Sequence, residues 1–217
     1  KPFHTLLLLT EKPAGWPLWS LTPLPAALAT VAGLVWIRAT GAPSLGLAVG
    51  LGLLFFALAD LALLAALPRW GLSFGPMQPP WLAMIVLRWG LTLMAALFTP
   101  SGALMALLAL SLLQLVLSLL AAYATLVEPF RPQVTQIEIC SPKLSNPGSP
   151  LRIVQLSDLH VERLTRRERA LPALVERLRP DLIVLTGDFL STTYNTDARA
   201  LADLQELLRQ LQAPRGV

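Results

Sequence analysis

Two acidic residues and a histidine follow short apolar segments in the last third of the chain. Asp158 and His160 stand two residues apart, just after residues 151–156, and Asp188 follows the apolar run 182–185. Residues two apart on an extended chain point to the same side, so Asp158 and His160 are expected to face one point. A carboxylate and an imidazole suit Mn, Fe or Zn, and a second carboxylate is able to bridge two such ions. These three residues are therefore the predicted metal ligands.

A strand, a helix and a second strand are predicted to position these ligands. The spacing between Asp158 and Asp188 fits one βαβ unit. Between the strands, Thr165 and Glu168 have the spacing of a capping box at the start of an amphipathic helix, and Pro172 predicts a kink or a later start. The carboxyl ends of parallel strands meet at one sheet edge, where open α/β sheets bind ligands. The predicted class of this part is therefore α/β.

Two further elements flank this unit. Residues 134–140 alternate apolar and polar side chains, which predicts a half-buried strand. The residues from 141 to 150 are rich in Ser, Pro, Asn and Gly and predict a turn, so that the strand joins residues 151–156 in a hairpin. Thr196 or Asp197 is expected to cap a final helix.

The chain before these elements is predicted to cross a membrane. Only 14% of all residues are charged, against about 25% in ordinary soluble domains, and only seven of the charged residues precede Glu128. Stretches of about 20 apolar residues are long enough to span a bilayer. A soluble helical bundle is the alternative, but it requires a polar face that these stretches lack. The prediction is a four-helix transmembrane domain over residues 1–127, a linker over 128–133 and a soluble domain over 134–217, with spans at about 18–37, 45–67, 81–98 and 102–127.

Several residues of this part refine the membrane prediction. Five tryptophans at span ends predict an interfacial belt: Trp16, Trp19, Trp36, Trp70 and Trp81. Asp60 and Arg88 are ionisable residues inside two spans, each about 10 Å along its helix from the shared loop, so they are expected to meet. A proton or substrate pathway is one interpretation, and a structural pair that joins two helices is the preferred one.

Basic residues near the span ends predict the orientation. Arg38 alone is expected on the side away from the termini, whereas four others are expected on the side of the termini: Lys12, Arg69, Arg131 and Lys143. The positive-inside rule then predicts a protein of the inner or plasma membrane with its soluble domain in the cytoplasm. No basic stripe with interleaved aromatic residues marks the soluble part, so no nucleic-acid partner is expected. The sequence leaves the oligomeric state open.

The motifs Asp158-Leu159-His160 and Gly187-Asp188 resemble the first two motifs of the calcineurin-like metallophosphoesterases, which are D-x-H after one strand and G-D after the next. The resemblance covers about residues 134–217 and implies the N-terminal part of an αββα sandwich. It implies that Asp158 and His160 bind one of two divalent metal ions and that Asp188 bridges both. Such a site hydrolyses phosphomonoesters or phosphodiesters with activated water.

Membrane-anchored bacterial members of this family share the plan of several spans followed by a phosphoesterase domain. The resemblance therefore implies a membrane-bound enzyme acting on a phosphorylated substrate, with lipid-linked phosphates among the candidates. The family's third motif, G-N-H-D or G-N-H-E, and its later histidines are absent from these residues, and both ends of the chain look cut. The catalytic residues are expected beyond Val217, and this fragment is expected to have little or no activity.

Two rival functions and one basic cluster remain open. The bundle could be a transporter or sensor regulated by a phosphoesterase-like domain, or that domain could be a catalytically inactive binding module. The cluster lies beside the first motif and could steer a phosphate or contact anionic lipid head groups, although the solvated start of a helix is the commoner meaning. Its members are Arg163, Arg166, Arg167 and Arg169.

Overall fold

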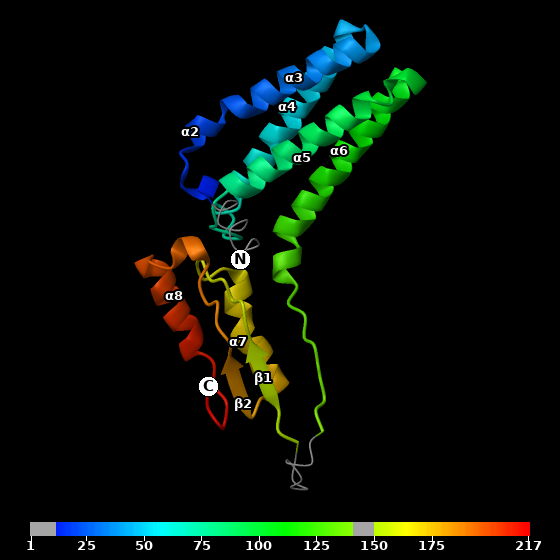
Figure 1. The fold of residues 1–217 in the computed structure, drawn as a ribbon. Coiled ribbons are helices and arrows are strands. Elements are labelled where there is room, and N and C mark those ends of the chain that lie inside the picture. Colours follow the sequence, from blue (N-terminus) through cyan, green and yellow to red (C-terminus); the bar gives the residue numbers. More distant parts are fainter. Residues whose placement is uncertain (1–11, 141–149) are drawn as a thin grey trace, which may run out of the picture. The chain divides into compact units, whose positions relative to one another are not determined.

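The computed structural model describes residues 12–140 and 150–217, which form two compact units. The first unit contains Lys1–Arg69 and Pro76–Thr125, and the second contains Trp70–Gly75 and Leu126–Val217 (Figure 1). Residues 70–75 come from the connection between two helices of the first unit, yet they pack with the second. The sequence prediction of domain boundaries placed these six residues in the membrane part.

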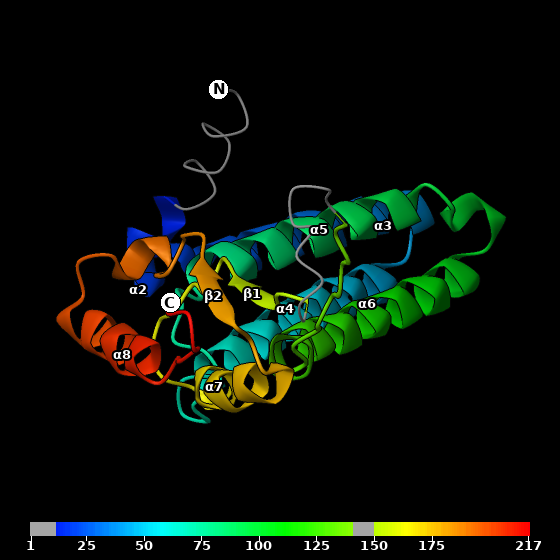
Figure 2. The same ribbon diagram turned by 90° about the horizontal axis from the view of Figure 1, so that it is seen from below.

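Helices make up the first unit (Figures 1 and 2). Four helical segments in it are long and apolar enough to cross a membrane, as the sequence predicted. Prolines occupy the first turns of α3, α4 and α5. Backbone N–H groups of a first turn have no partner within the helix, so proline, which lacks an N–H, costs no hydrogen bond there. The elements are η1 (Lys12–Gly15), α2 (Leu18–Leu21), α3 (Pro23–Thr40), α4 (Pro43–Ala66), α5 (Gln78–Ala96), η2 (Thr99–Ser101) and α6 (Ala103–Leu126).

The contact between α3 and α4 depends on small residues. A Cβ atom placed on Gly33 of α3 would lie 2.8 Å from the carbonyl oxygen of Gly46 in α4. Gly50 stands four residues after Gly46, and a Cβ atom placed on it would lie 3.0 Å from the carbonyl oxygen of Ala29 in α3. Glycine at these positions lets the two backbones meet, which is how apolar helices pack closely without a polar interface.

Two of the five predicted belt tryptophans are instead buried inside the bundle. Trp36 and Trp81 are both fully buried. Trp36 Nε1 donates to the Thr92 carbonyl at 3.0 Å, and Trp81 Nε1 donates to the Ala57 carbonyl at 2.8 Å. The belt prediction is therefore wrong for these two, because position along a helix does not determine which side of the helix a residue occupies. Each indole instead joins two helices.

Arg88 of α5 lies at the centre of a buried polar network. Its guanidinium binds Asp60 of α4 at both carboxylate oxygens, with Nε to Oδ2 at 2.8 Å and Nη2 to Oδ1 at 2.9 Å. Toward α6, Nη1 donates to the backbone and side-chain oxygens of Gln114, and Nη2 donates to Ser118 Oγ. The Phe56 ring lies 5.0 Å from the guanidinium carbon. All five N–H groups of Arg88 therefore have acceptors, which favours a structural role over a pathway.

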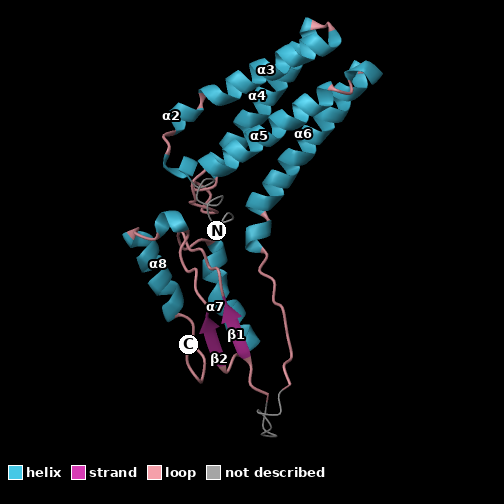
Figure 3. Ribbon diagram, viewed as in Figure 1, coloured by secondary structure: helices cyan, strands magenta, loops and turns pink. Residues whose placement is uncertain are grey.

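The second unit is built around two parallel strands (Figure 3). Strand β1 (Ile153–Leu156) pairs with β2 (Leu182–Leu185) in the register Ile153 to Leu182. Helix α7 (Arg166–Leu178) connects them and α8 (Ala198–Arg209) follows β2, with η3 (Glu128–Phe130) and η5 (Thr192–Tyr194) as short turns. The capping box of Thr165 and Glu168 is present. Helix α7 contains Pro172 in its interior without interruption.

Both helices pack on one face of the sheet. Val175 of α7 and Leu211 after α8 join buried Ile183 of β2, with Val154 and Leu171 packed beside them. The alternate positions of β1 face the other side and are exposed. One covered face explains why the apolar run in β2 is only partly buried. After α8, Arg215 N–H donates to Asp181 O and Ile183 N–H donates to Gly216 O, so the chain runs beside β2.

The predicted strand at residues 134–140 is not present. These residues have no regular secondary structure, and every one of them is exposed. Ile137 and Ile139 are 80% and 79% exposed. Alternation marks a strand only where a sheet edge and an apolar surface are available to it, and none meets this segment within the part of the chain that the structure describes. The predicted turn at 141–149 lies outside the described residues. The described residues contain one sheet of two strands. The full αββα sandwich therefore stays a prediction.

Candidate metal centre

The segments after β1 and β2 continue side by side beyond the ends of the strands. Asp158 N–H donates to Gly187 O at 3.2 Å, and His160 N–H donates to Asp188 O at 3.1 Å. Val161 N–H then donates to Phe189 O at 2.8 Å, where Val161 and Leu190 form a parallel bridge. Val161 is fully buried. The loops that carry the three predicted ligands are therefore fixed to each other by backbone hydrogen bonds.

All three predicted ligands have left-handed backbone conformations. The φ angles are 54° at Asp158, 43° at His160 and 51° at Asp188. Residues other than glycine rarely adopt positive φ, and when they do they cluster at functional sites. The prediction that strand alternation would align Asp158 with His160 is therefore wrong in its mechanism. Strand β1 ends at Leu156, and the turns beyond it bring the side chains together.

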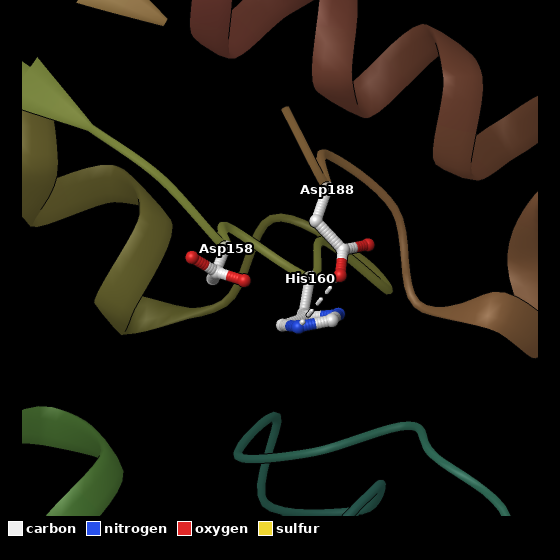
Figure 4. Close-up of side chains that lie close together, drawn as sticks. All are labelled: Asp158, His160 and Asp188. Atoms are coloured by element: carbon white, nitrogen blue, oxygen red, sulfur yellow. Dashed lines mark ion pairs between the residues drawn. The ribbon is translucent and has the colours of Figure 1, made fainter. Parts of the chain in front are cut away.

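The side chains of Asp158, His160 and Asp188 converge on one place (Figure 4). One ligand atom from each lies within 4.8 Å of the other two. His160 Nε2 and Asp188 Oδ2 are 3.4 Å apart, with side chains 47% and 55% exposed. Ser157 Oγ donates to Asp158 Oδ2, which leaves the other oxygen of this carboxylate for a ligand. The group is an open site on the surface of the second unit, and a dissolved ion or a phosphate ester has direct access to it.

The donor set fits a divalent metal ion. Oxygen and nitrogen ligands lie about 2.0–2.2 Å from Zn and similar ions, so two ligands of one ion are at most about 4.4 Å apart. The separations here, all within 4.8 Å, need small side-chain rotations only. Two carboxylates also offset the charge of a divalent ion. Asp158, His160 and Asp188 are therefore the residues that could hold it.

Other polar residues near the motifs have different partners. Asp197 caps α8, and Arg163 binds it at both oxygens, so that the Arg163 guanidinium lowers the pKa of the Asp197 carboxyl. Asp203 Oδ2 accepts the Leu164 N–H. Tyr194 donates its hydroxyl to the Phe74 carbonyl. None of these contacts is to the three predicted ligands.

Sequence inspection missed one set of contacts beside the site. Glu162, two residues after His160, accepts hydrogen bonds from Phe74 N at 2.8 Å and from Ser73 Oγ at 3.1 Å. These partners are 88 and 89 residues away along the chain. No local pattern marks Ser73 or Phe74, and no spacing rule connects them to Glu162, so only the folded chain reveals the contact.

Replacing Gly187 by alanine is expected to destabilise the second unit and to weaken metal binding. Gly187 has φ of 110°, a region that side chains disfavour at a cost of about 1–3 kcal/mol. A Cβ atom would meet nothing within 4 Å, so the effect would come from the backbone alone. Denaturant unfolding and Mn²⁺ titration of the variant would measure both changes. Gly71→Ala, at φ of 67° with equal space but away from the ligands, is the control, and it should leave Mn²⁺ affinity unchanged.

Comparison with known protein families places this geometry in context. Residues 151–215 match the model of the calcineurin-like phosphoesterase family. A search of curated proteins and a search of solved structures each found no match to the chain. The matched residues include β1, α7, β2 and α8 and all three candidate ligands. The part of the chain that carries the candidate metal centre is therefore similar to the calcineurin-like phosphoesterases.

Proposed function

We propose that this protein is a membrane-bound phosphohydrolase that uses two divalent metal ions to cleave a phosphomonoester or phosphodiester. The family match indicates metal-dependent hydrolysis of phosphoester bonds in general. The observation that carries the proposal is the convergence of Asp158, His160 and Asp188 at the carboxyl ends of two parallel strands. Open α/β sheets bind their ligands at this edge.

Each of the three side chains has a distinct part in the proposal. Asp158, with one oxygen held by Ser157, offers its other oxygen to the first metal ion. His160 offers Nε2 to the same ion. Asp188 has two carboxylate oxygens and faces His160 with one of them, so the second oxygen is available to bridge to another ion. Mn, Fe or Zn suits such mixed ligands.

The bound ions would polarise the phosphoryl oxygens and lower the pKa of an attacking water. The chain's own contribution is to hold the ligands in a fixed, exposed arrangement. Backbone hydrogen bonds between the two ligand loops give that rigidity. The exposure of His160 and Asp188 leaves room for a phosphate ester to approach.

The four apolar helices support the membrane part of the proposal. Their lengths and compositions suit a bilayer, and leucines cover the outer face of α6, for example Leu104, Leu108 and Leu112. An enzyme anchored in this way is suited to amphiphilic substrates such as lipid-linked phosphates. The excess of basic residues near one set of span ends favours the cytoplasm for the phosphoesterase unit. The rival function of a transporter receives less support, because every N–H group of Arg88 is engaged.

Hydrolysis of p-nitrophenyl phosphate and bis(p-nitrophenyl) phosphate by the protein expressed from its complete reading frame tests this function. We expect turnover with added Mn²⁺, its abolition by a chelator, and a loss of about 100-fold or more in Asp188→Ala. Asp181→Asn is a suitable control, because Asp181 accepts a backbone N–H of Arg152 at the other end of β2. No metal-dependent turnover on either substrate would count against the hydrolase, and equal loss in both variants would point to misfolding.

A further inference from the structure

The starts of α7 and α8 enclose a basic hollow in the second unit. The hollow measures about 420 Å³, within the range of about 300–1,000 Å³ that is typical of small-molecule sites. Phe74, from the 70–75 segment, contributes an aromatic wall. Three arginines and one carboxylate line the rest, namely Arg163, Arg169, Arg199 and Asp203, together with Leu164. None of them belongs to the candidate metal centre.

The structure divides the predicted basic cluster into engaged and available members. Arg163 is bound to Asp197 at 3.0 and 3.2 Å. Arg167 is bound to Glu168, and Arg166 stacks over the Phe130 ring at 4.7 Å. Arg169, which lines the hollow, is different. The only hydrogen bond of its side chain among the described residues runs from Nε to the Leu164 carbonyl at 3.3 Å, so both of its terminal nitrogens are available.

Arg199 is the second available arginine. It lies in the first turn of α8 and lines the same hollow as Arg169. Within residues 12–140 and 150–217 its guanidinium has no ion pair and no hydrogen bond. No local pattern associates Arg199 with Arg169, because the two belong to different helices. The fold therefore creates a pair of uncompensated guanidinium groups at one concavity.

The walls around this pair are held in place by their own contacts. Glu162 and Tyr194 hold Phe74 at its N–H and its carbonyl. Arg163 lies over the Tyr194 ring at 5.1 Å. The hydrogen bonds that the Arg163 guanidinium donates to the Asp197 carboxylate raise the pKa of Arg163. The hollow is thus pre-organised, which lowers the entropic cost of binding a ligand there.

The charge of the hollow favours an anion. Arg169 and Arg199 supply two positive charges that have no ion pair among the residues the structure describes. Asp203 supplies one negative charge, and its Oδ2 accepts the Leu164 N–H at 3.2 Å. The lining itself carries three arginines and one carboxylate, which favours an anion over a cation.

We propose that this hollow binds a phosphate-bearing anion through Arg169 and Arg199, beside the phosphoesterase centre but independently of its metal ions. The planar guanidinium presents paired N–H donors that match phosphate oxygens, so two arginines on one concavity suit a phosphate group. The phosphate comes either from a soluble ligand or from a lipid head group, since both present the same oxygens. Binding here does not rest on the proposed hydrolase activity.

Calorimetry with the full chain in neutral detergent tests the proposal. The protein is first treated with a chelator, so that metal-bound phosphate makes no contribution. One arm titrates inorganic pyrophosphate, and the other uses detergent micelles that contain phosphatidylglycerol, with phosphatidylcholine as the neutral comparison. We expect saturable binding of at least one phosphate probe. The Arg169→Gln and Arg199→Gln double variant should weaken it on the order of 10-fold or more. The arm that binds identifies the source of the phosphate.

Two control variants should leave phosphate binding unchanged, and one further variant should strengthen it. Arg177→Gln and Arg209→Gln remove exposed arginines from the last turns of the same two helices, and they should leave binding unchanged. Asp203→Asn keeps an oxygen for the Leu164 N–H but removes the negative charge, so it should tighten binding several-fold. Circular dichroism would verify that each variant is folded. Absence of binding in both arms, or equal weakening in the control variants, would overturn the proposal.

Discussion

Replacing Arg88 by alanine is expected to destabilise the first unit by about 3–5 kcal/mol. The substitution leaves Asp60, which is only 5% exposed, as a buried carboxylate without its partner. It also removes every hydrogen bond that α5 makes through this side chain to Gln114 and Ser118 of α6. Equilibrium unfolding in mixed micelles with increasing sodium dodecyl sulfate, followed by circular dichroism, would measure the loss.

Two further variants separate this effect from a general loss of arginine. Arg38→Ala removes an exposed arginine at the end of α3 and should change stability by less than about 0.5 kcal/mol. The double variant Asp60→Ala with Arg88→Ala should cost less than the sum of the two single variants, because neither charge is then left unpaired. Additive costs would mean that the ion pair contributes no coupling energy, and the network would lose its structural interpretation.

Replacing Asp188 by alanine is expected to lower the affinity of the chain for Mn²⁺ by at least about 100-fold. Loss of a side chain that merely orients a metal ligand typically costs about 10–100-fold in affinity, and Asp188 is a proposed direct ligand with the central position between two ions. His160→Ala and Asp158→Ala should also weaken binding. Titration of Mn²⁺ followed by electron paramagnetic resonance would report the free ion directly.

The exposure of the site makes this experiment straightforward to interpret. Asp188 and His160 have side chains 55% and 47% exposed, so their replacement should leave the fold intact. Glu176→Ala, at an exposed position of α7, removes one carboxylate elsewhere and serves as the matched control. If Glu176→Ala weakened Mn²⁺ binding as much as Asp188→Ala, the ion would be held by general surface charge rather than by the three convergent ligands.

The polar groups around Arg88 and around Asp188 lie in different units and differ in burial. The Arg88 network is buried, and every guanidinium N–H group of Arg88 already has an acceptor. No N–H group is therefore left to bind a substrate. The side chains of Asp158, His160 and Asp188 are exposed, and each offers an oxygen or nitrogen atom that could bind a metal ion. Buried groups with complete hydrogen bonding specify packing, whereas exposed convergent ligands suit binding and catalysis. The contrast favours a structural role for the Arg88 network and a ligand-binding role for the group around Asp188.

The sequence alone indicated the candidate ligand residues, the family resemblance and the apolar helices. Asp158, His160 and Asp188 were recognisable as candidates because they follow two apolar runs that are separated by one amphipathic helix. The match at residues 151–215 confirms the family. The four apolar segments were recognisable because the length and composition needed to span a bilayer are local properties of the chain.

The tertiary structure alone decided how these parts are used. Left-handed backbone turns, rather than strand alternation, bring Asp158 and His160 together, and such turns depend on pairing with the neighbouring loop. Residues 134–140 have the alternating pattern of a strand, but every one of them is exposed and none packs as a strand on the part of the chain that the structure describes. Phe74, Arg169 and Arg199 come from three distant segments and share one hollow. Local pattern determines which residues are able to form an element or bind a ligand, whereas contacts between distant segments determine which of them do.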